Sequence, residues 1–378
     1  MRLAPTAAGV ALGAAAGFNI ANVGPAADVL ADAYGVRLAA IGFLTTALFV
    51  THLAMQIPGG RLVDRRGAWI LGVWALVAVV AGNVIALLVP SFAFGIVGRL
   101  VAGFGTGVGF VAGSDYVRAT VGTPSAQGLY GASGVGGGGL ALAVVPLAVP
   151  ALGWRPPYVT ALVFALLVLA ALPLAPRDPR RGAVERGRIA DVVHDGRLYP
   201  LAIAHSASFG LSVVAANWAV SLLRDAGYSR GVAGAVAALT LLSGLVTRPL
   251  GGRLVERDPA RLGLLFGGSM LAAAAGTVLL LLNLPLGVRV VGAALLGLAA
   301  GLPFAGAFAG AQLLQPDDPG AAVGFVNSCA TFVILVGTPL VGLTFALPGQ
   351  GRAGFAAIAL AFVLAYVPVR RAALPVPA

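Results

Sequence analysis

The stretch GGRLVDRRG at residues 59–67 is a short charged segment between two long apolar runs. Its first part returns as GGRLVER at residues 251–257, which is 192 positions later in a chain of 378 residues. Two matching charged segments half a chain apart, in an otherwise apolar sequence, indicate the duplication of a membrane unit. We call residues 59–67 the first charged segment and residues 251–257 the second charged segment, and we expect each to form a charged turn.

The composition predicts that lipid is the solvent for most of the chain. Hydrophobic residues make up 59% of the sequence and charged residues only 10%, with a mean hydropathy of +0.96. A soluble domain carries roughly 25% charged residues, so this chain cannot cover its own surface in water. The only cysteine, Cys329, lies in an apolar run, which excludes a disulfide framework and a thiolate metal site.

Twelve apolar runs predict twelve transmembrane helices, because each spanning helix needs about 20 apolar residues. The expected spans are residues 5–24, 38–57, 68–89, 91–113, 126–149, 156–176, 198–222, 231–250, 261–283, 286–312, 320–344 and 353–369. The first run could be a signal peptide, but the eleven runs after it favour a retained helix. The polar residues 177–197 are predicted to link a six-helix bundle at 1–176 with a second at 198–378.

The arginines predict the orientation of the spans. With the amino terminus inside, the outer segments hold six arginines: Arg37, Arg155, Arg224, Arg230, Arg289 and Arg352. Arg99 and Arg248 fall within spans, and the rest of the 24 basic residues are inside. The positive-inside rule therefore predicts cytoplasmic termini and a cytoplasmic linker in a plasma or bacterial inner membrane. Arginines spread over helix ends, rather than gathered in one patch, argue against nucleic-acid binding.

The pattern G-x-L-x-D-R-x-G at residues 60–67 resembles the loop signature of the major facilitator superfamily of secondary transporters. Val145-Pro146-Leu147 and Thr338-Pro339-Leu340 are a second pair of repeat matches, so the resemblance covers essentially the whole chain. It implies an all-α polytopic membrane protein whose twelve helices form two pseudo-symmetric six-helix bundles. The glycine-rich fifth span and the arginine within the fourth are loosely similar to the cyanate and nitrate/nitrite permease branches.

The resemblance also implies a gate. In the superfamily the carboxylate that matches Asp64 binds the end of a helix from the other half, where the helix dipole and free N–H groups stabilise it. Glu256 would be a weaker latch in the second copy, and Asp115 with Arg118 would form a polar pair at the inner end of the fourth span. The predicted gating residues are Gly60, Asp64, Arg65, Gly67, Asp115, Arg118 and Glu256; the alternative for the arginines is that they only set topology.

Arg99 begins a pattern in the fourth span that resembles the superfamily's R-x-x-x-G motif, which is associated there with proton coupling. An ionisable group within a span is a functional hypothesis by default, and the alternative is an arginine that bonds to carbonyls of a neighbouring helix. His52 could also carry a proton, because imidazole titrates near neutral pH. Arg248 lies close to the second charged segment, so we expect it to snorkel to the membrane surface.

Polar side chains within the spans are candidates for the substrate cavity. They are predicted on helices that border the superfamily's cavity, and each has the alternative of a simple interhelical hydrogen bond. The predicted substrate-binding residues are Asn19, Asn22, Arg99, Tyr130, His205, Asn217, Trp218 and Asn327.

The sequence therefore predicts a secondary active transporter of a small solute. Proton coupling is expected, and Arg99 favours a small anion or an organic acid as substrate. Two alternatives are a proton-driven exporter of drugs or hydrophobic compounds and a membrane sensor that moves nothing. Motifs for hydrolysis, nucleotide binding and zinc binding do not occur, so neither an enzyme nor a cofactor is expected. We expect a monomer in the lipid bilayer.

Overall fold

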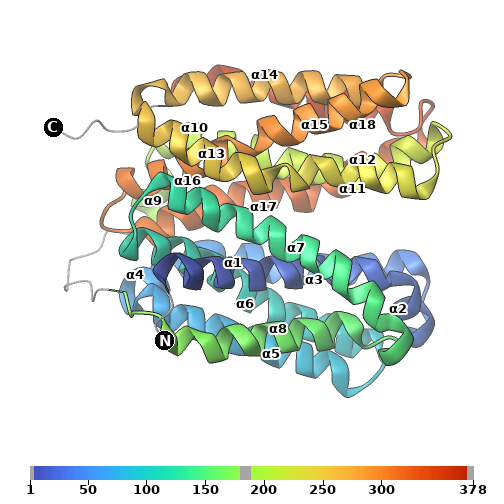
Figure 1. The fold of residues 1–378 in the computed structure, drawn as a ribbon, viewed down its shortest axis with the longest axis horizontal. Helices are drawn as coiled ribbons and strands as arrows, with labels where there is room; N and C mark the ends of the chain where they lie inside the picture. The colour runs from blue at the N-terminus through green and yellow to red at the C-terminus, as the bar shows by residue number, and fades with distance from the viewer. Residues whose placement is uncertain (1–3, 179–188, 373–378) are drawn as a thin grey trace. The chain divides into compact units, whose positions relative to one another are not determined.

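The computed structural model describes residues 4–178 and 189–372, and within them the chain is helical and forms no strand (Figure 1). In these residues eleven helices are long and apolar enough to cross a membrane. A twelfth span results if α3 (Leu38–Ala54) and α4 (Gln56–Arg66), which meet at an angle of 49°, are counted as one. The predicted fold class, an all-α polytopic membrane protein, is confirmed.

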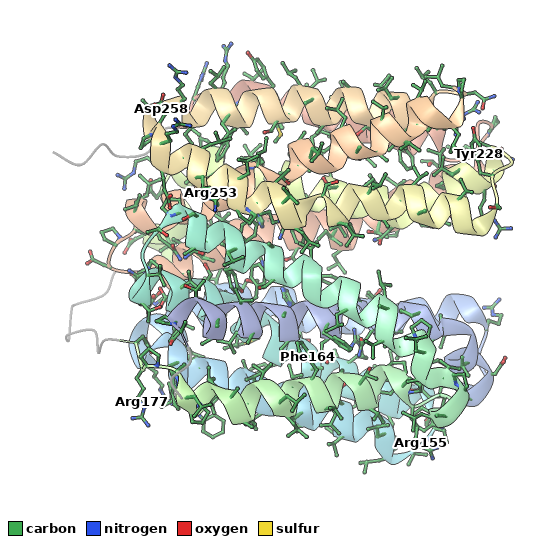
Figure 2. All side chains as sticks on the ribbon, viewed as in Figure 1. Arg155, Phe164, Arg177, Tyr228, Arg253 and Asp258 are labelled. Carbon is green, nitrogen blue, oxygen red and sulfur yellow. The ribbon has the colours of Figure 1, made fainter. Side chains whose placement is uncertain are left out.

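A chain of this composition is expected to form helices, because the hydrocarbon core of a bilayer offers no hydrogen-bond partner for a backbone N–H or C=O group. The helix bonds all of these groups internally, and its apolar side chains face lipid or other helices. Figure 2 shows the labelled charged residues at helix ends: Arg155 and Arg177 flank α8 (Pro156–Ala171) on opposite sides, while Phe164 lies between them. With charged residues placed at the helix ends, few charged side chains have to be buried within the spans.

The described residues form two compact units. Of the described residues, unit 1 comprises 4–122, 133–178, 189 and 317–324, and unit 2 comprises 123–132, 190–316 and 325–372. Besides α3, α4 and α8, unit 1 contains α1 (Pro5–Ala21), α2 (Ala27–Tyr34), α5 (Ala68–Leu88) and α6 (Phe92–Thr120). Unit 2 contains α9 (Ile189–His194), α10 (Leu198–His205), α11 (Ser212–Asp225), α12 (Arg230–Leu242), α13 (Gly244–Arg257), α14 (Leu262–Leu281), α15 (Leu286–Gly301), α16 (Pro303–Leu314) and α18 (Arg352–Val369).

Two long helices contribute to both units. α7 (Pro124–Leu152) begins in unit 2 and continues in unit 1 from Ser133. α17 (Pro319–Leu343) begins in unit 1 and continues in unit 2 from Phe325. The first turns of each helix therefore pack with residues from the opposite sequence repeat, while the rest of the helix packs with its own repeat.

Small residues let the helices in each unit approach closely. In unit 1, α6 packs against α1, α3 and α5, and a Cβ atom on Gly82 or Gly98 would overlap the backbone of the facing helix. In unit 2, α14 packs against α15, and a Cβ atom on Gly276 or Gly292 would likewise overlap the backbone of the facing helix. Close packing of this kind stabilises helices in lipid, where apolar side chains gain little by leaving their surroundings.

Local structure differs from the sequence prediction in three places. The prediction of charged turns is wrong, since α4 extends to Arg66 and α13 to Arg257, so both charged segments are helical almost to their ends. The short helix α2 was not expected. The seventh span contains a π-helical turn, Ser206–Leu211, between α10 and α11. Shorter 3-10 turns occupy Gly24–Ala26, Leu172–Leu174, Pro259–Arg261 and Thr344–Ala346.

Candidate functional site

The first charged segment binds the start of α17 within unit 1. Asp64 is buried, with 1% of its surface exposed, and its two oxygens accept hydrogen bonds from the N–H groups of Gly320 (2.9 Å) and Ala321 (3.0 Å). These N–H groups belong to the first turn of the helix and have no partner within it. The Asp64 carboxylate thus acts as a cap and interacts favourably with the positive end of the helix dipole.

Two further contacts hold α4 against α17. Arg61 forms an ion pair with Asp318, with 3.2 Å between Nη1 and Oδ1. Gly60 lies against the Gly320 carbonyl so closely that a Cβ atom would overlap it. Gly60 permits the close approach of α4 to α17, and the ion pair between Arg61 and Asp318 stabilises it. Arg65, which was also predicted to act in gating, is exposed.

Gly67 is the single residue that joins the end of α4 to the start of α5. Its φ of 91° lies in the left-handed region that favours glycine. The Asp178 carboxylate caps the next helix, because it accepts hydrogen bonds from the N–H groups of Ala68 (2.8 Å) and Trp69 (2.9 Å). Sequence reasoning had assigned Asp178 only to the polar linker, of which residues 179–188 lie outside the described residues. Nothing local in the sequence indicated that it folds back onto α5.

The second charged segment makes the corresponding contact in unit 2. Glu256 on α13 accepts a hydrogen bond from the Ser125 N–H at the start of α7 (2.7 Å), but this carboxylate is exposed. Gly252 lies against the Pro124 carbonyl, where a Cβ atom would overlap it. The backbone packing of the first segment is therefore repeated, whereas its buried two-bond cap is not.

Asp115 and Arg118 form an ion pair one turn apart near the end of α6, with 2.8 Å between the Arg118 Nε and the Asp115 oxygen. The carboxylate is fully buried and the guanidinium is partly exposed. The predicted pairing is therefore present, and its role in gating remains a prediction.

Arg99 lies in a buried polar network in unit 1. Its Nη1 donates to the carbonyl of Asn19 (2.7 Å) and to Oδ1 of Asn22 (3.0 Å), and its Nε donates to the carbonyl of Leu44 (3.3 Å). Asn83 joins the network by donating to Asn19 Oδ1 (2.8 Å). The buried Arg99 Nη2 has no hydrogen-bond partner. The structure thus brings Asn19, Asn22 and Arg99 together, and adds Asn83, which the sequence analysis missed.

His52 lies in the same unit and is also buried. Its Nδ1 is 3.0 Å from the hydroxyl of Thr106, and that hydroxyl donates to the carbonyl of Gly103 (3.1 Å). Because the hydroxyl hydrogen is used in this way, His52 Nδ1 is the donor to the oxygen. This arrangement gives the imidazole a defined tautomer.

A second buried cluster lies in unit 2 around His205 and Arg248. His205 Nε2 is 3.0 Å from Asn327 Oδ1, an acceptor, so Nε2 carries the proton. The remaining ring nitrogen, Nδ1, is buried without a hydrogen-bond partner. Phe209 stacks on the His205 ring at a centroid distance of 5.4 Å, and Phe308 meets it edge-on at 4.8 Å. The start of the π-helical turn at Ser206 directly follows this histidine.

The expectation that Arg248 snorkels is wrong, since only 6% of its surface is exposed. Its guanidinium lies over Phe304 (4.5 Å to the centroid) and Phe209 (5.2 Å). Nη1 donates to the carbonyl of Gly131 (2.6 Å), while the buried Nε has no partner. Gly131 follows the buried Tyr130. Arg248 corresponds by repeat to Gln56, whose side-chain amide is also buried and unbonded.

Asn217 and Trp218, the two remaining candidates for the substrate cavity, lie outside the cluster around His205 and Arg248. Asn217 is exposed. Trp218 donates through its indole N–H to the carbonyl of Thr338 (2.7 Å) and stacks on Phe345 at 5.0 Å. Neither residue has a recorded contact with His205, Arg248 or Asn327. Thus the structure groups Asn327 and His205 but separates them from the two predicted residues on α11.

Comparison with known proteins gives a consistent result. The family model of the Major Facilitator Superfamily matches residues 10–205, just over half of the chain. No curated protein matches the chain significantly. Similar solved structures include a variant of the E. coli fucose:proton symporter FucP (17% identity, TM-score 0.74, covering 97% of this chain and 98% of that one).

Two further solved structures are as similar. The human organic anion transporter MFSD10 has 17% identity and a TM-score of 0.75, with 97% of this chain and 98% of that one covered. The proton:xylose symporter XylE has 15% identity and a TM-score of 0.77, with coverage of 96% and 94%. At these identities the likeness establishes the fold alone.

Proposed function

Because the chain belongs to the Major Facilitator Superfamily, we propose that it transports a small anion or organic acid by alternating access, together with protons. The family and the fold support secondary transport across a membrane in general. The substrate class and the coupling to protons are the proposal. They rest on two buried arginines, one in each unit.

The observation that carries the proposal is that Arg99 and Arg248 are buried cations without a carboxylate partner among the described residues. Each also keeps one buried nitrogen unbonded, Nη2 in Arg99 and Nε in Arg248. A buried charge without a counter-ion is costly. An anionic substrate would neutralise the cation and accept the unused hydrogen bond, and such charge-assisted bonds are among the strong ones.

The buried carboxylates support the same substrate class. Asp64 caps α17, Asp115 pairs with Arg118, and Asp318 pairs with Arg61. Each of these acids already has a cationic or N–H partner. A dedicated site for an organic cation would be expected to offer an acid without one.

Proton coupling is proposed for Arg99, as the family resemblance implies, and for His52 and His205, because imidazole titrates near neutral pH. His205 and Arg248 contact the same two rings, Phe209 and Phe304, so they lie in one cluster. A positive Arg248 disfavours a second positive charge on the imidazole. A bound anion would cancel that effect, so the unbonded Nδ1 could take a proton when the substrate binds.

The test is uptake into proteoliposomes of labelled anions, sugars and amphiphilic cations, with and without a pH gradient. We expect accumulation of an anion that depends on the gradient. Arg248→Gln should lower it at least about ten-fold, because a charge-assisted hydrogen bond contributes about 1.5–3 kcal/mol. Arg224→Gln removes an exposed arginine at the end of α11 and should leave uptake unchanged. Accumulation of an amphiphilic cation alone would refute the anionic substrate.

A second candidate function is proton-driven export of hydrophobic compounds. The aromatic surroundings of Arg248, with Phe209, Phe304 and Phe308, favour this alternative because such compounds bind to aromatic surfaces. Susceptibility assays in an efflux-deficient host distinguish it from anion uptake. Resistance that is lost in Arg248→Gln, without anion transport in liposomes, would favour export.

We also propose that the protein is a monomer in a bacterial inner membrane with both termini in the cytoplasm. On this proposal residues 177–197 are a cytoplasmic linker between halves at 1–176 and 198–378. The excess of arginines on one side of the spans supports it. Labelling of single cysteines introduced into residues 177–197, with Cys329 replaced by alanine, tests the orientation. Reaction with an impermeant reagent from outside the cell would refute it.

A further inference from the structure

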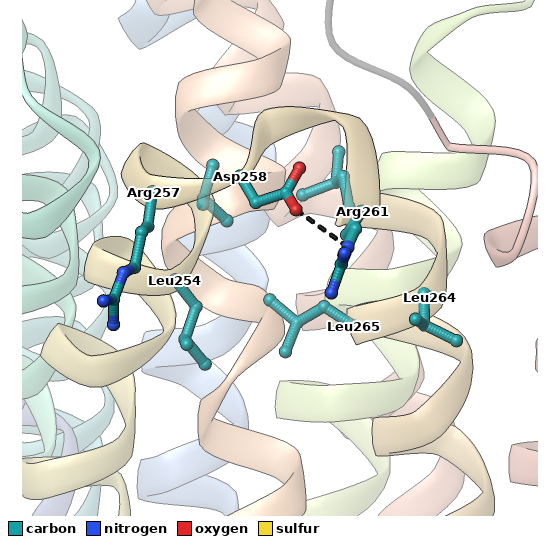
Figure 3. Close-up of a pocket in the computed structure, with 8 residues that line it drawn as sticks. Leu254, Arg257, Asp258, Arg261, Leu264 and Leu265 are labelled. Atoms are coloured by element: carbon teal, nitrogen blue, oxygen red, sulfur yellow. Dashed lines mark ion pairs between the residues drawn. The ribbon is translucent and has the colours of Figure 1, made fainter.

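A cavity of about 470 Å³ lies beside the second charged segment. It is formed by the end of α13, the 3-10 turn Pro259–Arg261 and the start of α14 (Figure 3). We call it the α13–α14 pocket. Because α13 ends the candidate span Val232–Arg257 and α14 belongs to the next one, Pro259–Leu281, the pocket lies at the short connection between two membrane spans. This is the depth at which lipid headgroups are expected.

The inner wall of the α13–α14 pocket is apolar. Val255 and Leu262 are each 1% exposed, and the side chains of both lie close to Gly306 on α16. Gly306 leaves room for the side chains of Val255 and Leu262, and these two side chains form the apolar floor of the pocket. Leu254 and Leu265 add further apolar surface, and in the view of Figure 3 they lie between the side chains of Arg257 and Arg261.

An apolar track leads away from the pocket along α14. Leu264 at the pocket is 72% exposed, and Leu271 and Val278 are 46% and 38% exposed. Their seven-residue spacing places them on one face of the helix, about two turns apart. On a membrane-spanning helix such a face meets acyl chains. The pocket is thus continuous with a surface suited to a hydrocarbon tail.

The rim of the pocket is cationic. Arg257 and Arg261 are exposed, and Arg261 forms an ion pair with Asp258 at 2.8 Å. Glu256 is used in the hydrogen bond with Ser125. In the described part of the chain no ion-pair partner is recorded for Arg257. The rim therefore keeps an unneutralised positive charge above an apolar floor.

We infer that the α13–α14 pocket binds an anionic glycerophospholipid. The phosphate interacts with Arg257 and Arg261, the glycerol region lies over Leu254 and Leu265, and one acyl chain follows the track that begins at Leu264. Basic pockets between membrane helices suit anionic headgroups, and arginine binds phosphate through paired N–H donors. A free anion would have no use for the apolar track, and a zwitterionic lipid would bring a cationic group to the arginines.

The experiment measures lipid retention by the full-length protein. The protein is stripped of lipid in detergent and exposed to mixtures of phosphatidylglycerol and phosphatidylcholine, and bound lipid is counted by native mass spectrometry. Each arginine near a membrane surface raises the affinity for an anionic lipid by about five-fold, which corresponds to about 1 kcal/mol. We expect phosphatidylglycerol to be preferred, and the double variant Arg257→Gln/Arg261→Gln to bind it roughly 30-fold more weakly.

The matched control is Arg253→Gln, which removes an exposed arginine of the same segment that does not line the pocket. It should retain phosphatidylglycerol as the unaltered protein does. Leu265→Trp, which fills the cavity without changing its charge, should also reduce retention. Circular dichroism and gel filtration verify that each variant is folded.

Three results would overturn the inference. They are equal retention of the two lipids, undiminished retention in the double variant, and displacement of phosphatidylglycerol by millimolar inorganic phosphate. The last result would assign the arginines to a free phosphate ion. None of these measurements requires transport, so the inference stands or falls independently of the proposed function.

Discussion

The two charged segments share the sequence GGRLV but bind their helices differently. In the first, Asp64 is buried and accepts two N–H hydrogen bonds at the start of α17. In the second, Glu256 is exposed and accepts one at the start of α7. The glycines behave alike, since Gly60 and Gly252 each lie against the first turn of the helix they bind. The repeat has therefore kept the close backbone approach and changed the strength of the polar lock.

The ends of the segments differ as well. Gly67 closes the first segment with a positive φ, and Asp178 then caps α5. The second segment lacks this glycine and continues through Asp258 into a 3-10 turn, beside which the α13–α14 pocket opens. We infer from this difference that the first segment is the stronger latch and that the second has room for a lipid-binding role. Both assignments can be tested by paired substitutions.

The largest difference is expected between Asp64→Asn and Glu256→Gln. Asparagine keeps the shape of the side chain but turns an NH2 group toward one of the two helix N–H donors. Hydrogen bonds to a charged group contribute about 1.5–3 kcal/mol, so we expect transport turnover in proteoliposomes to fall about ten-fold. Glu256→Gln alters one exposed bond and should change turnover less than about two-fold. Equal effects, or unchanged turnover in Asp64→Asn, would contradict the assignment of the stronger latch.

Gly60→Ala and Gly252→Ala should be similar to each other. A Cβ atom at either position overlaps a backbone carbonyl of the facing helix, so the two helices must separate. We expect each variant to lose several-fold in turnover and to unfold at a lower temperature, because overpacking typically costs about 1–3 kcal/mol. Gly268→Ala on α14, where a Cβ meets open space, is the control. If only one of the first two variants were affected, the backbone approach would not be a shared feature.

The smallest difference is expected between Arg61→Gln and Arg253→Gln, which occupy equivalent positions in the repeat. Arg61 is mostly buried and pairs with Asp318, whereas Arg253 is exposed. Ion pairs of this kind contribute about 1 kcal/mol or less, so turnover should fall a few-fold in Arg61→Gln and stay constant in Arg253→Gln. The measurement is initial uptake at matched protein density. A fall in Arg253→Gln as large as that in Arg61→Gln would argue that both arginines act through the membrane surface.

Much of this architecture could be predicted from the sequence. The predicted apolar runs correspond to helices, because a length of about 20 apolar residues admits no other structure in lipid. The repeat at residues 59–67 and 251–257 identified the segments that bind the starts of α17 and α7. The sequence did not predict that these segments are helical, because arginine is compatible with helix and with turn alike.

The clusters around the buried arginines were only partly foreseen. Asn19, Asn22 and Arg99 could be grouped as polar residues within spans, but Asn83 contacts Asn19 only because α5 packs against α1 in unit 1. Arg248 was expected at the surface on the basis of its sequence position. Its burial depends on Phe209 and Phe304, which come from two other segments.

The sequence by itself determined that the chain is a helical membrane protein with an internal repeat, because apolar run length and repeat spacing can be read along the chain without knowing its fold. Only the tertiary structure decided which charges are locked, which are left unbonded and where a pocket opens. Those outcomes depend on the distance between groups far apart in the chain, such as the Asp64 carboxylate and the backbone N–H of Gly320. A difference of one methylene between Asp64 and Glu256 gains its meaning only from the helix end that each carboxylate meets.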